Sequence, residues 1–166
     1  MNLIVAVSEN YGIGKDNDLL FSLPTDLKYF KEKTLNKVVV MGRRTFDYLP
    51  FKPLKNRVNI VVTTDKTFFC DGVIVVHSFE ELFEKLKEYN DDDIFLIGGS
   101  SIYNKLIEKC RLAYITKVQK TVEADTFLTN IEQKENWKEI SSSDVLTEND
   151  LNFQFKVFEN QVVKKD

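Results

Sequence analysis

The sequence has little of what builds metal centres, disulfide frameworks or membrane spans. Its 166 residues include two cysteines and one histidine. Cys70 and Cys110 have no Cys or His partner at metal-ligand spacing, so we expect no metal site. Three prolines and six glycines leave no linker, repeat or low-complexity tract. The apolar run Leu3–Val7 is too short for a signal peptide or a membrane span.

The sequence also lacks a large excess of charge of either sign. The formal net charge is −3, so no basic field favours nucleic acid or an anionic membrane as a partner. An anionic ligand would need a few locally placed Arg and Lys side chains. Two unpaired thiols without a leader segment fit a reducing compartment, and we therefore expect a cytoplasmic protein.

The apolar runs predict the fold. A chain of this length fits one domain, which we place at residues 1–160, followed by a polar tail at 161–166. Five short apolar runs are continuous rather than alternating, which is typical of strands covered on both faces of a mostly parallel sheet. They are Leu3–Val7, Val38–Met41, Val58–Val62, Val73–Val76 and Ile94–Ile97.

Helical patterns fall between these runs. Ser78 and Glu81 form a capping-box pattern at the start of a predicted helix over 78–89, and Pro24 begins another over 24–33. A third helix follows Gly98-Gly99. Alternating strands and helices predict an α/β fold. Residues 111–118 and 151–159 are predicted to close the sheet as an antiparallel hairpin, and Asp91–Asp93 to form a solvated turn.

Three predicted strands end in residues suited to phosphate groups. In an open α/β sheet, ligands bind beyond the carboxyl ends of the strands. Gly42-Arg43-Arg44-Thr45, Thr63-Thr64 and Gly98-Gly99-Ser100-Ser101 occupy three such ends. A planar guanidinium can donate two parallel hydrogen bonds to phosphate, and small residues let backbone amides approach it. Singly, each loop is better explained as a solvated face or a turn, whereas three of them at strand ends make a dinucleotide site as good an explanation. Neither GxGxxG nor GxxxxGK[ST] is present.

Asp26 is a carboxylate in the first turn of the helix predicted after Pro24. The helix dipole alone explains an acidic residue there, so the position by itself does not indicate function. Four ordered blocks change that interpretation: Leu3–Ser8 with Gly12-Ile13-Gly14; residues 23–30, LPTDLKYF; residues 40–46, VMGRRTF; and Ile97-Gly98-Gly99, followed by Tyr103. With these blocks the chain resembles the bacterial dihydrofolate reductases to about residue 160.

The resemblance implies a fold, an activity and partners. The expected fold is an eight-stranded, mostly parallel twisted sheet with an antiparallel C-terminal strand, flanked by four helices. The expected activity is the NADPH-dependent reduction of 7,8-dihydrofolate to tetrahydrofolate by hydride transfer to the pterin, for one-carbon metabolism. The resemblance also implies a cytoplasmic monomer.

The resemblance further implies two sets of site residues. Asp26 would be the catalytic carboxylate that binds the 2-amino group and N3 of the pterin. Thr116 would hold Asp26, and Arg57 would bind the α-carboxylate of the glutamate tail. The remaining substrate-binding residues would be Ile4, Val5, Ala6, Leu27, Phe30, Leu49 and Leu54. The nicotinamide would lie among Ala6, Ile13, Gly14, Ile97 and Tyr103. Gly98, Gly99, Ser100, Ser101 and Ile102 would cradle the pyrophosphate, with a cis peptide at Gly98–Gly99. Gly42, Arg43, Arg44, Thr45, Thr63 and Thr64 would hold the adenosine end and its 2′-phosphate.

The sequence departs from the family pattern at two site positions. Phe21 stands where bacterial members commonly carry Trp, so an indole N–H near the pterin is missing. Ser101 stands where many members have Arg, so the preference for NADPH would rest on Arg43 and Arg44. Two alternatives remain: a pyrimidinone or pteridine reductase of the same fold, for which the 23–30 block and Arg57 have no purpose, and a non-catalytic nucleotide-binding module.

Overall fold

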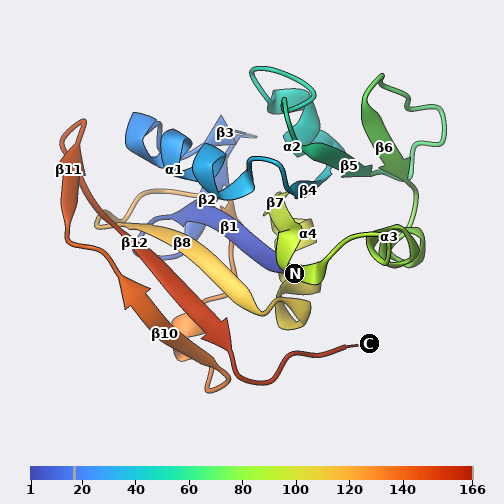
Figure 1. Cartoon of the computed structure of the whole chain (residues 1–166). Helices are drawn as coiled ribbons and strands as arrows, with labels where there is room; N and C mark the ends of the chain where they lie inside the picture. Colours follow the sequence, from blue (N-terminus) through green and yellow to red (C-terminus); the bar gives the residue numbers. More distant parts are fainter. Residues whose placement is uncertain (17, 166) are drawn as a thin grey trace.

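Nine strands form one sheet in the computed structural model, which describes residues 1–16 and 18–165. Eight of them lie in the order β10-β12-β8-β1-β7-β4-β5-β6, and β11 pairs only with β12 (Figure 1). The bounds are β1 Asn2–Val7, β4 Val38–Gly42, β5 Val58–Val62, β6 Val73–Val76, β7 Ile94–Gly98, β8 Leu112–Val118, β10 Trp137–Ser142, β11 Leu146–Glu148 and β12 Leu151–Asn160. All pairings from β8 through β1 to β6 are parallel, whereas β12 pairs antiparallel with β8, β10 and β11.

The five apolar runs form β1, β4, β5, β6 and β7, so these predictions are confirmed. The predicted strands at the C-terminal end are confirmed as β8 and β12, with Phe155 opposite Thr116. The prediction that a hairpin joins them is wrong. The chain first passes through β9 (Thr126–Phe127), β10 and β11, and β12 then enters the sheet between β8 and β10. The solvent-facing residues of β10 lack an apolar pattern, and that is why the sequence did not reveal it.

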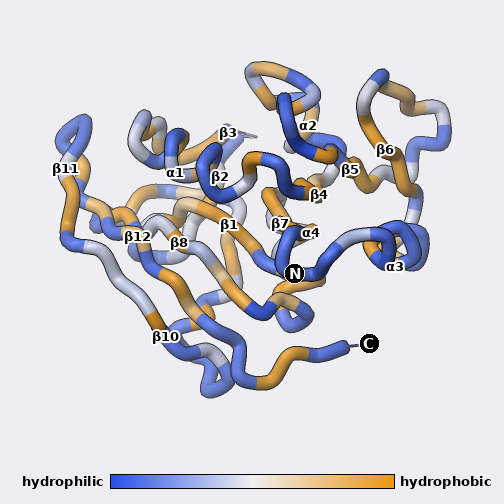
Figure 2. Tube along the Cα trace, in the orientation of Figure 1, coloured by the Kyte–Doolittle hydropathy of each residue, from blue (hydrophilic) through white to orange (hydrophobic). Residues whose placement is uncertain are grey.

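Four helices cover both faces of the sheet: α1 Pro24–Thr34, α2 Arg43–Tyr48, α3 Phe79–Leu86 and α4 Ser100–Leu106. Leu3, Val40 and Leu96 belong to the core under α3 and α4. Val39, Met41 and Val61 point the other way and pack with Phe46 of α2. Side chains of a strand alternate between faces, and both faces are covered, so the runs are continuously apolar. Figure 2 shows the hydrophobic colour following these central strands.

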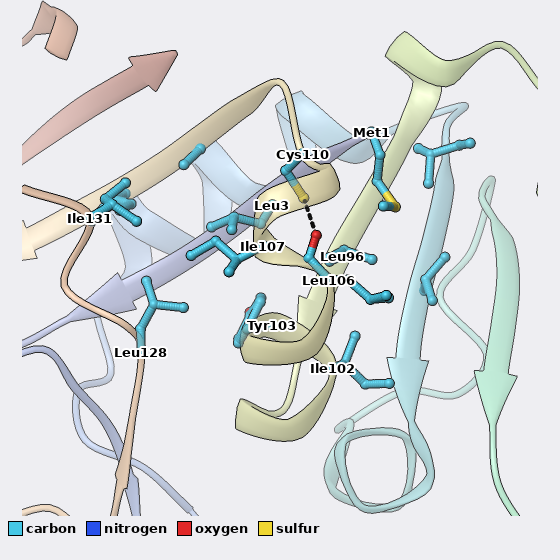
Figure 3. Close-up of a cluster of buried hydrophobic side chains, with 14 of the residues drawn as sticks. Met1, Leu3, Leu96, Ile102, Tyr103, Leu106, Ile107, Cys110, Leu128 and Ile131 are labelled. Carbon is cyan, nitrogen blue, oxygen red and sulfur yellow. Dashed lines mark hydrogen bonds between the residues drawn. The ribbon is translucent and has the colours of Figure 1, made fainter. Parts of the chain in front are cut away.

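The larger core lies beneath α4 and contains one of the two free cysteines (Figure 3). Tyr103 and Leu106 of α4 pack there with Leu3 and Leu96. Cys110 is fully buried and its thiol donates to the carbonyl of Leu106 at 3.6 Å, which satisfies its weak donor. Burial raises the pKa of this thiol to about 12, so it stays protonated.

The capping box predicted at the start of α3 is only partly present. Ser78 accepts from the amide of Glu81 at 3.1 Å, as predicted, but the Glu81 carboxylate accepts from the backbone amide of His77 rather than that of Ser78.

Asp91–Asp93 forms a 3-10 helix (η1) whose three carboxylates pair with the N-terminal amine, Arg111 and Lys37, so it is more than a solvated turn.

The remaining short elements lie along the rim of the sheet. A small second sheet pairs β3 (Asp18–Leu19), β2 (Gly12–Lys15) and β9. Two further 3-10 helices are η2 (Ile107–Lys109) and η3 (Ile131–Gln133). In the predicted tail, the Lys164 amide donates to the carbonyl of Glu108 at 2.9 Å, and Asp166 lies outside the described residues. None of the helices in the described ranges is long and apolar enough to cross a membrane.

Candidate active site

The carboxyl ends of β1, β4, β5 and β7 lie along one edge of the sheet because these strands are parallel. The loops after β4 and β7 meet there. A Cβ on Gly98, whose φ is 127°, would lie 3.3 Å from the Thr45 hydroxyl. Residues with side chains would therefore crowd this approach, and only Gly adopts this φ without strain. The predicted cis peptide at Gly98–Gly99 is present.

Asp26 lies over the sheet beside this edge. The Thr116 hydroxyl of β8 donates to its carboxylate at 2.6 Å, so the predicted contact between the two is present. Ala6 of β1 is directly beside Thr116 in the sheet register. On the neighbouring strand, Phe155 stacks on Tyr29 of α1 at 4.1 Å between ring centroids, which holds α1 against this face. We call Ile4, Ala6, Asp26 and Thr116 the Asp26 end of the site.

Burial raises the pKa of Asp26 above its ordinary value of 3.8. The hydrogen bond from Thr116 opposes that shift, and the charge of Glu148 adds to it. The pKa of Tyr103 is raised as well, first by burial and then by the charge of Asp26. Its hydroxyl donates to the Ile4 carbonyl at 2.8 Å, which ties α4 to β1 beneath the site.

Glu148 caps the helix that carries Asp26. Leu23, at the N-cap position of α1, makes no side-chain capping bond. The Glu148 carboxylate instead accepts from the Thr25 amide at 3.0 Å and from the Thr25 hydroxyl at 2.6 Å. These bonds lower the pKa of Glu148, and they satisfy a free amide in the first turn of α1. A strand near the end of the chain therefore sets the start of the Asp26 helix.

The apolar residues expected around the substrate do not all point the same way. Leu49 and Leu54 pack against the cluster that contains Val39 and Met41, as does Ile97, which was expected beside the nicotinamide. Phe30 is half-buried, and Leu27 is 60% exposed on α1. Val5 packs against the core of the opposite face, so at that position only the backbone can face the Asp26 end.

Arg57 lies where α1 ends. Its guanidinium donates to the Lys55 carbonyl at 2.9 Å and to the Thr34 hydroxyl at 3.2 Å. Partial burial lowers its pKa, and it has no carboxylate partner in the described part of the chain. A surface cavity of about 350 Å³ adjoins it, lined also by Asn36, Lys37, Asn56 and Val58. Arg57 is therefore free to receive an anion.

The adenosine-side residues lie at the far end of the same edge, and we call Arg43, Arg44, Asp47, Thr63, Thr64 and Asp65 the Arg43 end. Arg43 donates through Nε to Asp47 at 3.0 Å and through a terminal nitrogen to Asp65 at 3.4 Å. Arg44, Thr64 and Ser101 are exposed, and Ser100 is half-exposed at the start of α4. Gly42 precedes α2 directly, and Ile102 lies on the buried face of α4.

Of the residues predicted for the nicotinamide, Ile13 and Gly14 lie on β2. Both are buried, and Ile13 packs in the same core as Tyr103. Phe21 is partly buried and packs against the cluster of Leu23, Val118 and Phe153.

Two residues with structural roles at the site, Asn59 and Glu148, were not predicted from the sequence. Asn59 is 1% exposed within β5. Its side-chain oxygen accepts from the Leu54 amide at 2.9 Å, and its side-chain nitrogen donates to the Leu54 carbonyl at 2.9 Å and to the Arg57 carbonyl at 3.1 Å. It thereby fixes the loop that carries Leu54 and Arg57. A polar residue inside an apolar strand was the available signal. Glu148 had no local signal, since its partner is 123 positions away.

The fold and these residues define an α/β protein with a partly buried carboxylate at one end of a ligand edge and arginines at the other. The dihydrofolate reductase family model matches residues 1–160. The chain belongs to the dihydrofolate reductase family. It is 38% identical over 138 residues to the Haemophilus influenzae dihydrofolate reductase, covering 83% of this chain and 81% of that protein. It is 34% identical to the Bacillus subtilis dihydrofolate reductase, covering 97% and 95%. The Enterococcus faecalis dihydrofolate reductase, solved in complex with NADP(H) and RAB-propyl, superposes with a TM-score of 0.84 at 33% identity, covering 96% of this chain and 95% of that chain.

Proposed function

We propose that this chain reduces 7,8-dihydrofolate to tetrahydrofolate with NADPH as reductant, through the site around Asp26. The observation that carries the proposal is the Asp26–Thr116 pair at 2.6 Å, located on the face beside Ala6 and the Gly98–Gly99 approach. The match of the dihydrofolate reductase family model to residues 1–160 supports the same activity.

Asp26 orients and polarises the substrate. Its carboxylate accepts hydrogen bonds from the 2-amino group and N3 of the pterin, while Thr116 holds the carboxylate in place. The negative charge favours a protonated, positively charged pterin, which is the better hydride acceptor. Asp26 does not reach N5 itself, so water supplies the proton there. Ile4, Ala6, Leu27, Phe30, Leu49 and Leu54 enclose the rings, and Arg57 binds the α-carboxylate of the tail.

The residues present fit a dinucleotide. The glycines at 98 and 99 leave an approach that a Cβ would narrow, and Thr45 faces it. Ala6, Ile13, Gly14, Ile97 and Tyr103 would hold the nicotinamide; Gly98, Gly99, Ser100, Ser101 and Ile102 the pyrophosphate; and Gly42, Arg43, Arg44, Thr45, Thr63 and Thr64 the adenosine end. When bound, NADPH supplies the hydride. The protein supplies alignment, since hydride donor and acceptor must lie within about 3–3.5 Å to react.

We place the protein in the cytoplasm as a single-domain monomer. The free thiols of Cys70 and Cys110 support the cytoplasmic location, because they fit a reducing compartment.

The deciding experiment follows NADPH absorbance with and without dihydrofolate. We expect oxidation only when dihydrofolate is present. A folded protein that binds NADPH but shows no dihydrofolate-dependent oxidation contradicts the proposal and favours a non-catalytic nucleotide-binding module. Oxidation with a pyrimidinone substrate and none with dihydrofolate would favour the other reductase of this fold.

A further inference from the structure

The two arginines after β4 are in different electrostatic states. Arg43 donates through Nε to both carboxylate oxygens of Asp47, at 3.0 and 3.1 Å, and a second nitrogen donates to Asp65 at 3.4 Å. Its guanidinium also lies 3.9 Å from the centroid of the Phe68 ring. Arg44 is exposed, and none of the ion pairs between described residues involves it. Arg43 is thus already balanced by two carboxylates, whereas the charge of Arg44 is free.

Asp65 is held in a defined position. One of its oxygens accepts from the amide and the hydroxyl of Thr67, at 2.9 and 2.6 Å, while the other faces Arg43. Its own amide donates to the Thr63 hydroxyl at 3.1 Å. The bonds from Thr67 lower the pKa of Asp65, and Arg43 lowers it further. The carboxylate is therefore charged throughout the neutral range.

A fixed carboxylate at the Arg43 end matters for the choice of cofactor. Nucleotide-binding folds typically place a carboxylate to accept the ribose 2′-hydroxyl of NAD, and an arginine to bind the 2′-phosphate of NADP. Asp65 and Asp47 both offset the positive charge that would attract a phosphate dianion, and Ser101 contributes no charge to replace it.

We propose that Asp65 is a specificity-determining residue that narrows the preference for NADPH over NADH, because its carboxylate occupies Arg43 and repels a 2′-phosphate. The proposal rests on the proposed function, since it assumes that the adenosine end of the cofactor lies beside Arg43 and Arg44.

The test is Asp65→Asn, which keeps the shape and the acceptor for Thr67 but removes the charge. Titration calorimetry would measure Kd for NADP⁺, NAD⁺, adenosine 2′,5′-bisphosphate and AMP. We expect the two ligands with a 2′-phosphate to bind about threefold to tenfold more tightly, because a repulsive charge near a dianion is removed. NAD⁺ and AMP should change by less than about twofold, and raising the salt concentration should shrink the gain.

Asp71→Asn is the matched control, because it removes one exposed charge from the same loop without touching Arg43. If it tightens NADP⁺ binding as much as Asp65→Asn does, net charge explains the effect and the proposal is overturned. An unchanged NADP⁺ to NAD⁺ ratio in Asp65→Asn overturns it too, while NADP⁺ binding by the wild type leaves the proposed function standing. Binding of neither dinucleotide by the wild type overturns the cofactor assignment as well.

Discussion

The Asp26 end and the Arg43 end of the site lie on one edge of the sheet but differ in how they hold charge. At the Asp26 end, one carboxylate lies among apolar residues, with Thr116 as its hydrogen-bond partner and burial raising its pKa. At the Arg43 end, four charged side chains lie at the surface, and two carboxylates offset one guanidinium.

The difference predicts how each end responds to substitution. A charge in low-dielectric surroundings interacts strongly with its ligand, and no neighbour can replace it. Exposed charges interact weakly and are screened by salt, so the loss of one is partly made up by others. Single substitutions should therefore affect catalysis most at the Asp26 end, and shift only selectivity at the Arg43 end.

The largest effect is expected for Asp26→Asn. Loss of the charge should lower kcat at least about 10²-fold near neutral pH, within the range for a positioned acid or base group. Activity should recover toward acid pH, where the medium supplies protons. The pH profile of kcat checks this prediction, and near-wild-type kcat at pH 7 would refute the role of Asp26.

The same variant should be more stable than the wild type at neutral pH. The pKa of Asp26 is raised in the folded chain, so the folded state binds the proton more tightly than the unfolded state. Stability from this group is therefore present below its ordinary pKa and is lost as the pH rises through the folded value. Asn removes that cost. Denaturant unfolding at two pH values would measure it, and a less stable variant would show that Asp26 has a structural role instead.

Arg57→Leu should have the next largest effect. The loss of a charge-assisted contact to the substrate carboxylate costs about 1.5–3 kcal/mol, or about tenfold to a hundredfold in KM for dihydrofolate. KM for NADPH should stay nearly unchanged. Arg44→Ala is the comparison at the other end, and it should narrow the preference for NADPH over NADH. If both variants changed KM for the same ligand, the division of the site into two ends would be wrong.

Phe21→Trp probes the missing indole with a smaller expected effect. Phe21 packs against Leu23, Val118 and Phe153 and offers no donor. The variant should fold and remain active, with kcat or dihydrofolate affinity changed by less than about tenfold, the range for one water-mediated hydrogen bond. Steady-state kinetics measures this. A larger gain would show that the wild-type enzyme lacks any substitute for that donor.

Glu148→Ala should have the smallest kinetic effect, and its value lies in the comparison with Glu148→Gln. Alanine removes the cap of α1, so the melting temperature should fall, and kcat/KM should fall by less than about fivefold. Glutamine keeps a neutral acceptor for Thr25, so the melting temperature should fall less than with alanine. Both variants lose a charge that raises the pKa of Asp26, so in both the acid limb of the pH profile should move to lower pH. An unshifted profile would leave Glu148 with a purely structural role.

The sequence by itself determined most of the central strands, the helix starts and the approximate ends of the site. Continuous apolar runs predicted β1, β4, β5, β6 and β7, and the Ser78 pattern predicted the start of α3, because these signals depend on neighbouring residues. The small and basic residues after β4 and β7 were recognised for the same reason. The strands β10 and β11 were missed because an exposed edge needs no apolar pattern.

Only the tertiary structure decided which groups meet. Asp26 and Thr116 are 90 residues apart, and Glu148 is 123 residues from the helix it caps. The Glu148 contact depends on β11 pairing with β12, which no local pattern specifies. Likewise, the sequence showed two equivalent arginines, and the fold made them unequal by bringing Asp65 to Arg43. Ion pairing and burial depend on distances through space, and these are set by the order of strands in the sheet rather than by spacing along the chain.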